Sequence, residues 1–305
     1  MTDIAGKRWL MLPVTGVASR FPALLRAGLL FTLTPGCCLT VAAAPDADPT
    51  EEVFDFNYVY GAVFGTGYYK TDTERLYLLR YPAALSLTSY QRPTRLLLPV
   101  AAGFREADFE EAPESVSDNF TNFSFMPGIA TDFRLRDNWQ LTPSAQLGMA
   151  WDTRNNTSSW VGSAAVRHHA WWDLDAGRLT LAQRLRVAGQ HNRDTGNETA
   201  ILLVENGADW EFATPLSFRK RPLIASVFFV WQRYINDLKI DGIDPGRTRI
   251  DQTFQLGVTL GFSSPTKLGW LSLERLGLSI TRGDSIAGDE ITAINISLGF
   301  PLVRD

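Results

Sequence analysis

Charged residues recur at every second position in several segments of this chain, and this spacing is the first clue to chemistry. In a β-strand, successive side chains point to opposite faces, so residues two apart share a face. Arg184 and Arg186 form a basic pair, and Glu205, Asp209 and Glu211 follow in the next segment with one parity. Two neighbouring strands with opposite charges would form ion pairs or line a charged interior.

The candidate residues share the face opposite to the apolar face of each segment. They are Asp132, Arg134, Arg167, His169, Arg184, Arg186, Glu205, Asp209 and Glu211. If consecutive segments pair, Arg184 or Arg186 should face Glu205 or Asp209. Two interpretations stay open: the charged rows line a selective channel, or they form a network that fills the interior and ties the strands together.

The two adjacent histidines raise the possibility of a hydrolase. His168 and His169 lie on one segment with Ser163 and Asp173. A nucleophile and its base must lie within hydrogen-bond reach. Six residues separate Ser163 from His169, which is about 20 Å along a strand. This pair is therefore excluded, and we predict no catalytic residue and no enzymatic activity. An outer-membrane enzyme acting on lipid or polysaccharide remains an alternative.

Two further motifs could bind ligands from outside. Asp237, Asp241, Asp244 and Asp251 share one segment, but their spacing differs from that of an EF-hand. We expect no bound metal and no cofactor. The tripeptide at residues 282–284 (RGD) matches an adhesion motif, and we interpret it as turn chemistry.

The elements that must position these residues are strands with one apolar face. Near the end of the chain, Ile294, Ile296, Leu298, Phe300 and Leu302 alternate with small or polar residues. Similar segments are residues 54–64, 76–90, 94–104, 123–136, 139–151, 160–173, 178–190, 199–212, 223–234, 252–262, 271–281 and 293–303. Strands with one lipid-facing and one wet face are typical of membrane barrels. The sequence predicts an all-β, antiparallel, up-and-down transmembrane β-barrel of about 12 strands.

Composition agrees with a barrel and limits the partners. The chain has 305 residues, 20% of them charged, and a net charge of -4. The mean hydropathy is -0.07, as expected when half of each strand is polar. No apolar stretch of about 18 residues follows residue 50, so no transmembrane helix is predicted there. The near-neutral charge argues against a nucleic-acid partner.

The organisation of the chain follows from its first residues and its loops. Residues 1–43 are predicted to be a signal peptide, with basic residues, an apolar core at 27–33 and small residues before Ala44. Residues 44–53 form a short N-terminal segment, and residues 54–305 form the barrel. Short gaps at 137–138 and 174–177 contrast with long gaps at 105–122 and 235–251. We predict that the short gaps are periplasmic turns and the long gaps are outer loops of a barrel in the bacterial outer membrane.

The last two strands carry a motif: residues 276–284 (LGLSITRGD), then Gly288, then residues 296–302 (ISLGFPL). This end resembles the solitary outer-membrane autotransporter-type β-barrel family of Gram-negative bacteria. Many outer-membrane barrels end on an aromatic residue, whereas here residues 303–305 follow Leu302. The resemblance implies a twelve-stranded barrel with no passenger domain, and it carries over little about activity.

The sequence therefore predicts an integral outer-membrane barrel that acts as a narrow, porin-like pore or as a structural surface protein. Its expected partners are outer-membrane lipids and the barrel-assembly machinery, which would recognise the C-terminal strand. The oligomeric state stays open. A further alternative is an adhesin-like surface binder that uses the outer loops at 105–122 and 235–251.

Overall fold

The computed structural model describes the part of the chain that forms the barrel. The described residues are Val59 and residues 63–70, 74–88, 93–107, 119–153, 156–239, 249–268, 271–284 and 290–303. The chain divides into two compact units, residues 1–52 and 53–305. The predicted signal peptide at 1–43 and the predicted short segment at 44–53 lie outside the described residues. Among the described residues, no helix is long and apolar enough to cross a membrane.

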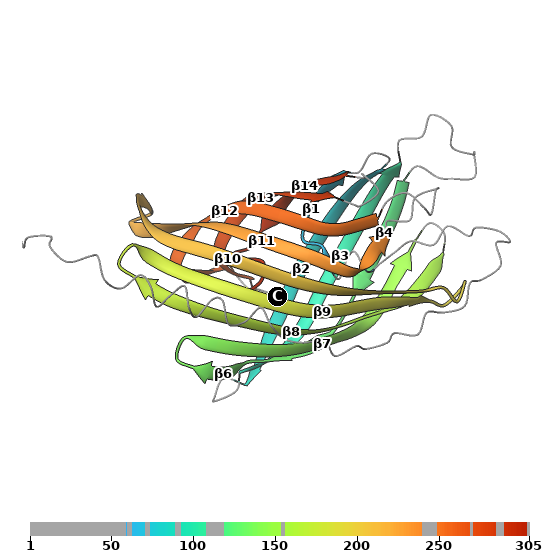
Figure 1. Cartoon of the computed structure of the whole chain (residues 1–305), viewed down its shortest axis with the longest axis horizontal. Coiled ribbons are helices and arrows are strands. Elements are labelled where there is room, and N and C mark those ends of the chain that lie inside the picture. The colour runs from blue at the N-terminus through green and yellow to red at the C-terminus, as the bar shows by residue number, and fades with distance from the viewer. Residues whose placement is uncertain are drawn as a thin grey trace, which may run out of the picture. The chain divides into compact units, whose positions relative to one another are not determined.

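The second unit is a closed, antiparallel β-barrel of 12 strands, which confirms the predicted fold (Figure 1). Its elements are β1 (Gly67–Lys70), β2 (Glu74–Thr88), β3 (Thr94–Ala107), β4 (Asn119–Phe125), β5 (Gly128–Thr131), β6 (Phe133–Arg136), β7 (Trp139–Asp152), β8 (Thr157–Leu174), β9 (Gly177–Asn192), β10 (Glu198–Phe218), β11 (Arg221–Lys239), β12 (Arg249–Leu268), β13 (Leu271–Asp284) and β14 (Glu290–Ser297). The short elements β4, β5 and β6 all pair with β7, so they are consecutive pieces of one wall strand.

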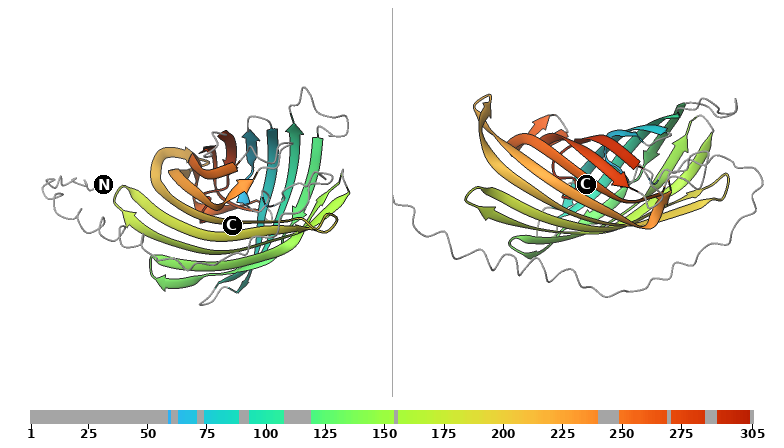
Figure 2. Two further views of the ribbon diagram at one scale, coloured as in Figure 1. Left: turned by 45° about the vertical axis from the view of Figure 1, so that its right-hand side comes forward. Right: turned by 45° about the horizontal axis from the view of Figure 1, so that its top comes forward.

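The barrel closes where the first strand meets the last. β1 pairs with β14 from Gly67↔Asn295 to Lys70↔Thr292, and β1 also pairs with β2. Every other strand pairs with its neighbour in sequence, so the topology is up-and-down. Figure 2 shows this wall from two further directions. We call the end with the connections at 137–138, 175–176 and 219–220 the turn end, and the opposite end the loop end.

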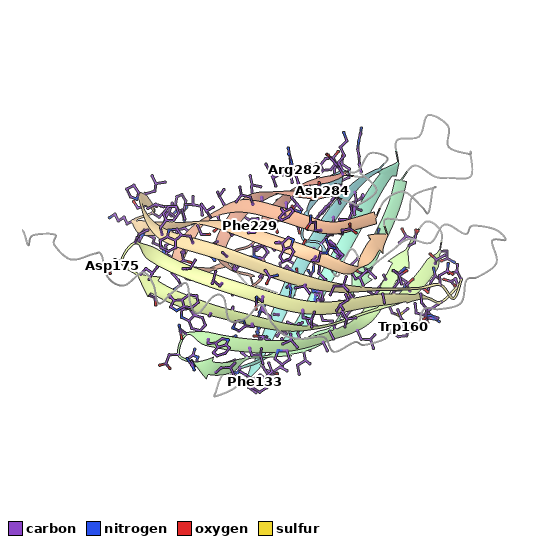
Figure 3. All side chains as sticks on the ribbon, in the orientation of Figure 1. Phe133, Trp160, Asp175, Phe229, Arg282 and Asp284 are labelled. Carbon is purple, nitrogen blue, oxygen red and sulfur yellow. The ribbon has the colours of Figure 1, made fainter. Side chains whose placement is uncertain are left out.

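Side chains alternate between the interior and the outer surface as the sequence predicts. In β9, Ala182 and Ala188 are buried, whereas Leu185 is 51% exposed. Phe229 and Trp160 project from the outer surface (Figure 3). Because a membrane barrel turns its apolar side chains to lipid, this exposed apolar belt is the surface expected to contact hydrocarbon. The fold is therefore of the outer-membrane type.

The predicted first strand, residues 54–64, is wrong. The first wall strand is β1, which begins at Gly67. Val59 and Val63 have helical backbone, and Phe64, predicted to face lipid, is only 6% exposed and stacks on Tyr69 inside the barrel. The remaining residues of 54–62, apart from Val59, lie outside the described residues. An apolar alternating segment can pack inside a barrel as well as on its outside, so the sequence pattern was ambiguous here.

The predicted last strand, residues 293–303, is right in its first half and wrong in its second. Ile294 and Ile296 face outward at 56% and 49% exposed. β14 ends at Ser297, and Phe300 and Leu302 are buried inside the barrel at 2% and 1% exposed. The chain leaves the wall at Gly299, whose φ of 109° lies in a region that L-residues avoid. We call residues 298–303 the tail.

Two smaller corrections concern strand ends. β10 runs to Phe218 and β12 to Leu268, beyond the predicted ends at 212 and 262. Arg282, Gly283 and Asp284 lie within β13, so they are not a turn. Arg282 and Asp284 are exposed near the loop end (Figure 3). Strand pairing continues through these end residues, as in Ser217↔Pro222 and Thr266↔Leu273.

Candidate functional site in the barrel interior

A buried ion pair forms the centre of the interior. Arg184 on β9 lies directly opposite Glu205 on β10. Both Arg184 Nε and Nη2 donate to the carboxylate, Nη2 to Oε1 at 2.7 Å, and Glu205 is 0% exposed. Gln232 Nε2 on β11 donates to Glu205 Oε1 at 2.8 Å, and Thr253 Oγ1 on β12 donates to Gln232 Oε1 at 2.7 Å. This chain of bonds ties four neighbouring strands together.

Positive charge gathers around this pair. Arg186 Nε lies 3.8 Å from Glu205 Oε2, on the same face of β9 as Arg184. Arg167 on β8 lies directly opposite Arg184, and both are buried. Like charges at directly opposite positions repel, so their burial needs compensating negative groups. The inner faces of β8 and β9 therefore form a basic wall. We call Arg167, Arg184 and Arg186 the arginine cluster.

A second ion-pair network lies nearer the turn end. Arg275 Nη1 on β13 contacts Asp209 Oδ2 at 2.9 Å and Glu211 Oε2 at 3.2 Å. Asp209 is buried, whereas Glu211 is partly exposed. Because β10 and β13 are not adjacent in the sheet, this contact spans the interior between non-neighbouring strands.

A third polar group lies beside the arginine cluster, on β8 and the strands that follow it around the sheet. Asp132 Oδ1 accepts hydrogen bonds from Arg95 Nη2 at 3.1 Å and Thr142 Oγ1 at 2.8 Å. Thr142 is opposite Arg167, and Gln140, on the same face of β7, is opposite His169. His169 is 7% exposed, and its Nδ1 has no hydrogen-bond partner among the described residues.

A cavity of about 150 Å³ lies beside the Arg184–Glu205 pair. Its wall includes Arg80, Arg184, Arg186 and Glu205, together with hydroxyl and amide side chains of β7, β12 and β13. Residues 63–66 and 296–302 also line it. The cavity is thus a polar space inside the barrel, bounded by wall strands and by both segments that enter the interior.

The tail packs against the inner wall. Phe300 and Leu302 form an apolar cluster with Ala182, Phe228 and Val230, and the Phe228 and Phe300 ring centroids are 6.1 Å apart. Gly207 makes room for this contact. A Cβ there would lie 2.9 Å from Leu302 Cδ1 and 3.0 Å from Phe300 Cζ. The wall is therefore shaped to accept the tail.

The segment before β1 is held by hydrogen bonds across the closing seam. Tyr69 Oη donates to the Gly65 carbonyl at 2.9 Å, and Asn295 Nδ2 on β14 donates to Tyr69 Oη at 2.6 Å. Thr281 Oγ1 on β13 donates to Asn295 Oδ1 at 2.8 Å. Buried polar groups that lose such bonds are costly, so this chain stabilises both the seam and the entry of residues 63–66.

The structure brings most of the nine candidate residues into three groups. Arg184, Arg186 and Glu205 meet in the ion pair, with Arg167 beside them. Asp209 and Glu211 share Arg275. Asp132 and His169 belong to the third group, beside the arginine cluster. Arg134 is opposite Gln140 but exposed at the turn end, away from all three groups. Within the described residues, no group of His, Cys, Asp and Glu could hold a metal ion. Residues 241–248 of the acidic loop lie outside them.

Three interior arginines escaped the sequence reasoning: Arg80, Arg95 and Arg275. Each follows or precedes an outward leucine, at Leu79, Leu96 and Leu276. The same parity rule that found the other candidates would have placed them inside. The tail contacts gave no comparable signal.

Comparisons with known proteins give one solved structure to report. No family model matches the chain, and no curated protein sequence matches it. LpxR from Salmonella typhimurium matches with 12% identity and a TM-score of 0.39, over 78% of this chain and 91% of that chain. We withdraw the prediction that the chain lacks enzymatic activity. At this identity the likeness concerns the barrel fold alone.

Proposed function

We propose that this outer-membrane-type barrel is a narrow pore for small anions, with the tail as its gate. The observation that carries the proposal is the cavity wall, on which Arg80, Arg184 and Arg186 face one carboxylate, Glu205. Charges act strongly where water is scarce, so a basic wall around a small cavity favours anions. The setting we propose is the bacterial outer membrane, and the resemblance to autotransporter-type barrels stays a prediction.

The gate is the apolar contact of the tail with the wall. Phe300 and Leu302 are held against Phe228 and Val230, on the turn-end side of the cavity. Burial of two large apolar side chains contributes roughly 3–6 kcal/mol, which a closed resting state requires. Gly299 is the flexible backbone position about which the tail would swing when the gate opens.

Single-channel recording in planar bilayers tests the gate. The double variant Phe300→Ser/Leu302→Ser should conduct steadily, whereas the unaltered protein should be closed for most of the recording. Val303→Ser is the matched control, because Val303 belongs to the tail but is only partly buried. Equal currents from all three proteins would overturn the gate, and no current from any would favour a closed structural barrel.

A second candidate function is an enzyme acting on lipid or polysaccharide. The observation that favours it is the hydrogen bond from Thr142 Oγ1 to Asp132 Oδ1, with His169 on the neighbouring strand. A carboxylate that accepts a hydroxyl proton activates that oxygen as a nucleophile. This arrangement replaces the Ser163–His169 pair that spacing excludes.

Incubation of the purified protein with lipopolysaccharide, followed by mass spectrometry of the lipid and the sugar, tests this candidate. Product should form with the unaltered protein and disappear with Thr142→Ala. His191→Ala, an exposed histidine at the loop end, is the control and should keep full activity. Product formation that survives Thr142→Ala would show that this site is not responsible.

Three further expectations belong here as proposals. We propose that outer-membrane lipids surround the apolar belt and that the assembly machinery recognises β14, whose outward residues Ile294 and Ile296 remain accessible. An adhesin-like role would use the outer loops predicted at 105–122 and 235–251, of which residues 108–118 and 240–248 lie outside the described residues. The acidic character of the first loop is its only support.

A further inference from the structure

Strand pairing across the closing seam covers only part of the height of the wall. β1 is four residues long and reaches only Leu78 of β2, and β14 ends at Ser297, opposite Gly277 of β13. Among the described strands, β2 beyond Leu78 pairs only with β3, and β13 before Gly277 pairs only with β12. We call the interval between residues 79–88 of β2 and residues 271–276 of β13, on the turn-end side of the seam, the seam gap.

The interior cavity is bordered by residues of the seam gap. The chain enters the wall after residues 63–66 and leaves it at the tail, and both segments line the cavity. Arg80 and Pro82, on the β2 side of the gap, line it too. Ile296 also borders the cavity, although its side chain is 49% exposed on the outer surface. Irregular backbone at membrane depth is tolerated where it lines a cavity, and here the cavity adjoins the lipid-facing surface.

The outer surface beside the seam gap is apolar. The outward residues of β2 along the gap include Leu79, Leu85 and Leu87, which are 62%, 56% and 55% exposed. Leu276 of β13 is 49% exposed. These side chains continue the belt that is expected to contact hydrocarbon. The seam gap is therefore expected to face the acyl chains of the membrane.

The β2 edge of the gap is a poor template for an added strand. Thr66 Oγ1 accepts a hydrogen bond from Arg80 N at 2.9 Å and donates one to the Arg80 carbonyl at 2.8 Å. Backbone groups two residues apart point to the same side of a strand, so Pro82 is the next residue facing the gap. Proline has no N–H to donate. Both features protect a sheet edge against pairing, which argues against a peptide strand as the occupant of the gap.

The cavity wall favours a small anionic group. Among the described residues, its charged members are Arg80, Arg184, Arg186 and Glu205. Its volume of about 150 Å³ is room for an ionic headgroup, since a water takes about 30 Å³ of the liquid, but not for a long acyl chain as well. A ligand with such a chain would have to leave the chain outside the cavity, and the seam gap leads to the medium in which that chain is soluble.

We propose that the seam gap is a side entrance through which the cavity binds an acyl-chain amphiphile with an anionic headgroup. The headgroup lies near Arg80, and the acyl chain lies in the gap beside Pro82 and Ile296. The inference goes beyond the pore proposal, because such a site takes its ligand from the membrane even in a barrel that never conducts.

Photo-labelling of the unaltered protein tests where the acyl chain lies. The probe is dodecanoate with a diazirine at the end of its chain, and the protein is held in phosphatidylcholine nanodiscs. Mass spectrometry of peptides should find adducts on residues 79–88 or 296–298 that excess dodecanoate suppresses. Leu147 and Leu185, which are 62% and 51% exposed on other strands, report contact with bulk lipid. Equal labelling at these leucines, or adducts that dodecanoate does not suppress, would overturn the proposal.

A second measurement tests the headgroup. The dodecanoate concentration that halves the suppressible labelling should rise about tenfold in Arg80→Gln, the loss of one charge-assisted interaction. Arg75→Gln is the control, because Arg75 lies on the same strand but is not among the residues that line the cavity. Heat-modifiable gel migration should show that both variants fold. Equal rises in the two variants, or equal suppression by dodecyltrimethylammonium, would contradict an anionic headgroup at Arg80.

Discussion

Arg184 and Glu205 face each other across β9 and β10 inside the barrel, with both guanidinium nitrogens Nε and Nη2 on one carboxylate. Glu205 is wholly buried and Arg184 is 8% exposed. The register of β9 and β10 thus places a buried carboxylate directly beside the guanidinium that neutralises it.

Replacement of Glu205 should destabilise the barrel strongly. Glu205→Gln leaves the arginine cluster without its carboxylate, and breaking one partner of a buried pair costs about 3–5 kcal/mol. Urea unfolding in lipid vesicles measures the change. Glu198→Gln is the control, because Glu198 is exposed beside His191 and an exposed pair contributes about 1 kcal/mol or less. Similar losses from both variants would show that burial of the pair is not what matters.

The seam between β1 and β14 should depend on one hydroxyl. Tyr69→Phe removes the group that accepts from Asn295 and donates to Gly65, so we expect a loss of about 1–3 kcal/mol. The temperature at which the folded band disappears from a gel should fall. Tyr68→Phe, which alters the outward neighbour on β1, should leave that temperature unchanged. A fall of the same size for Tyr68→Phe would contradict the assignment.

Gly207 should control whether the tail stays docked. A Cβ at this position would also lie 2.8 Å from the Phe229 carbonyl oxygen, so Gly207→Ala should push the tail away from the wall. With Val303→Cys as reporter and the two native cysteines replaced, labelling by a water-soluble maleimide should become faster. Gly162→Ala is the control, since its nearest atom would be 3.4 Å away and outside the interior. Unchanged labelling in Gly207→Ala would show that the tail is not held there.

Alternation in the sequence predicted the wall well because one rule governs every wall strand. Outward leucines such as Leu256 and Leu278 are exposed, and inward residues such as Ser279 are buried, as parity requires. The same rule placed Arg184 and Glu205 on one face. Register between neighbours then brought them together, because consecutive strands of an up-and-down barrel pair directly.

Parity could not distinguish lipid from a packed interior. Phe64, Phe300 and Leu302 continue an apolar alternation, yet all three are buried inside the barrel. The chain leaves the wall at Gly299, and no local pattern before it announces the change. Which apolar segment fills the interior depends on space between distant strands, such as the room that Gly207 leaves, and single-sequence periodicity does not contain that information.

The ion selectivity of the opened barrel tests the central claim most directly. The reversal potential of Phe300→Ser/Leu302→Ser channels, measured across a potassium chloride gradient, reports whether chloride or potassium passes more readily. The arginines outnumber the carboxylates on the cavity wall. We therefore predict a reversal potential with the sign that a chloride-selective channel gives. A reversal potential with the sign of a potassium-selective channel, or a reversal potential of zero, would contradict an anion pore.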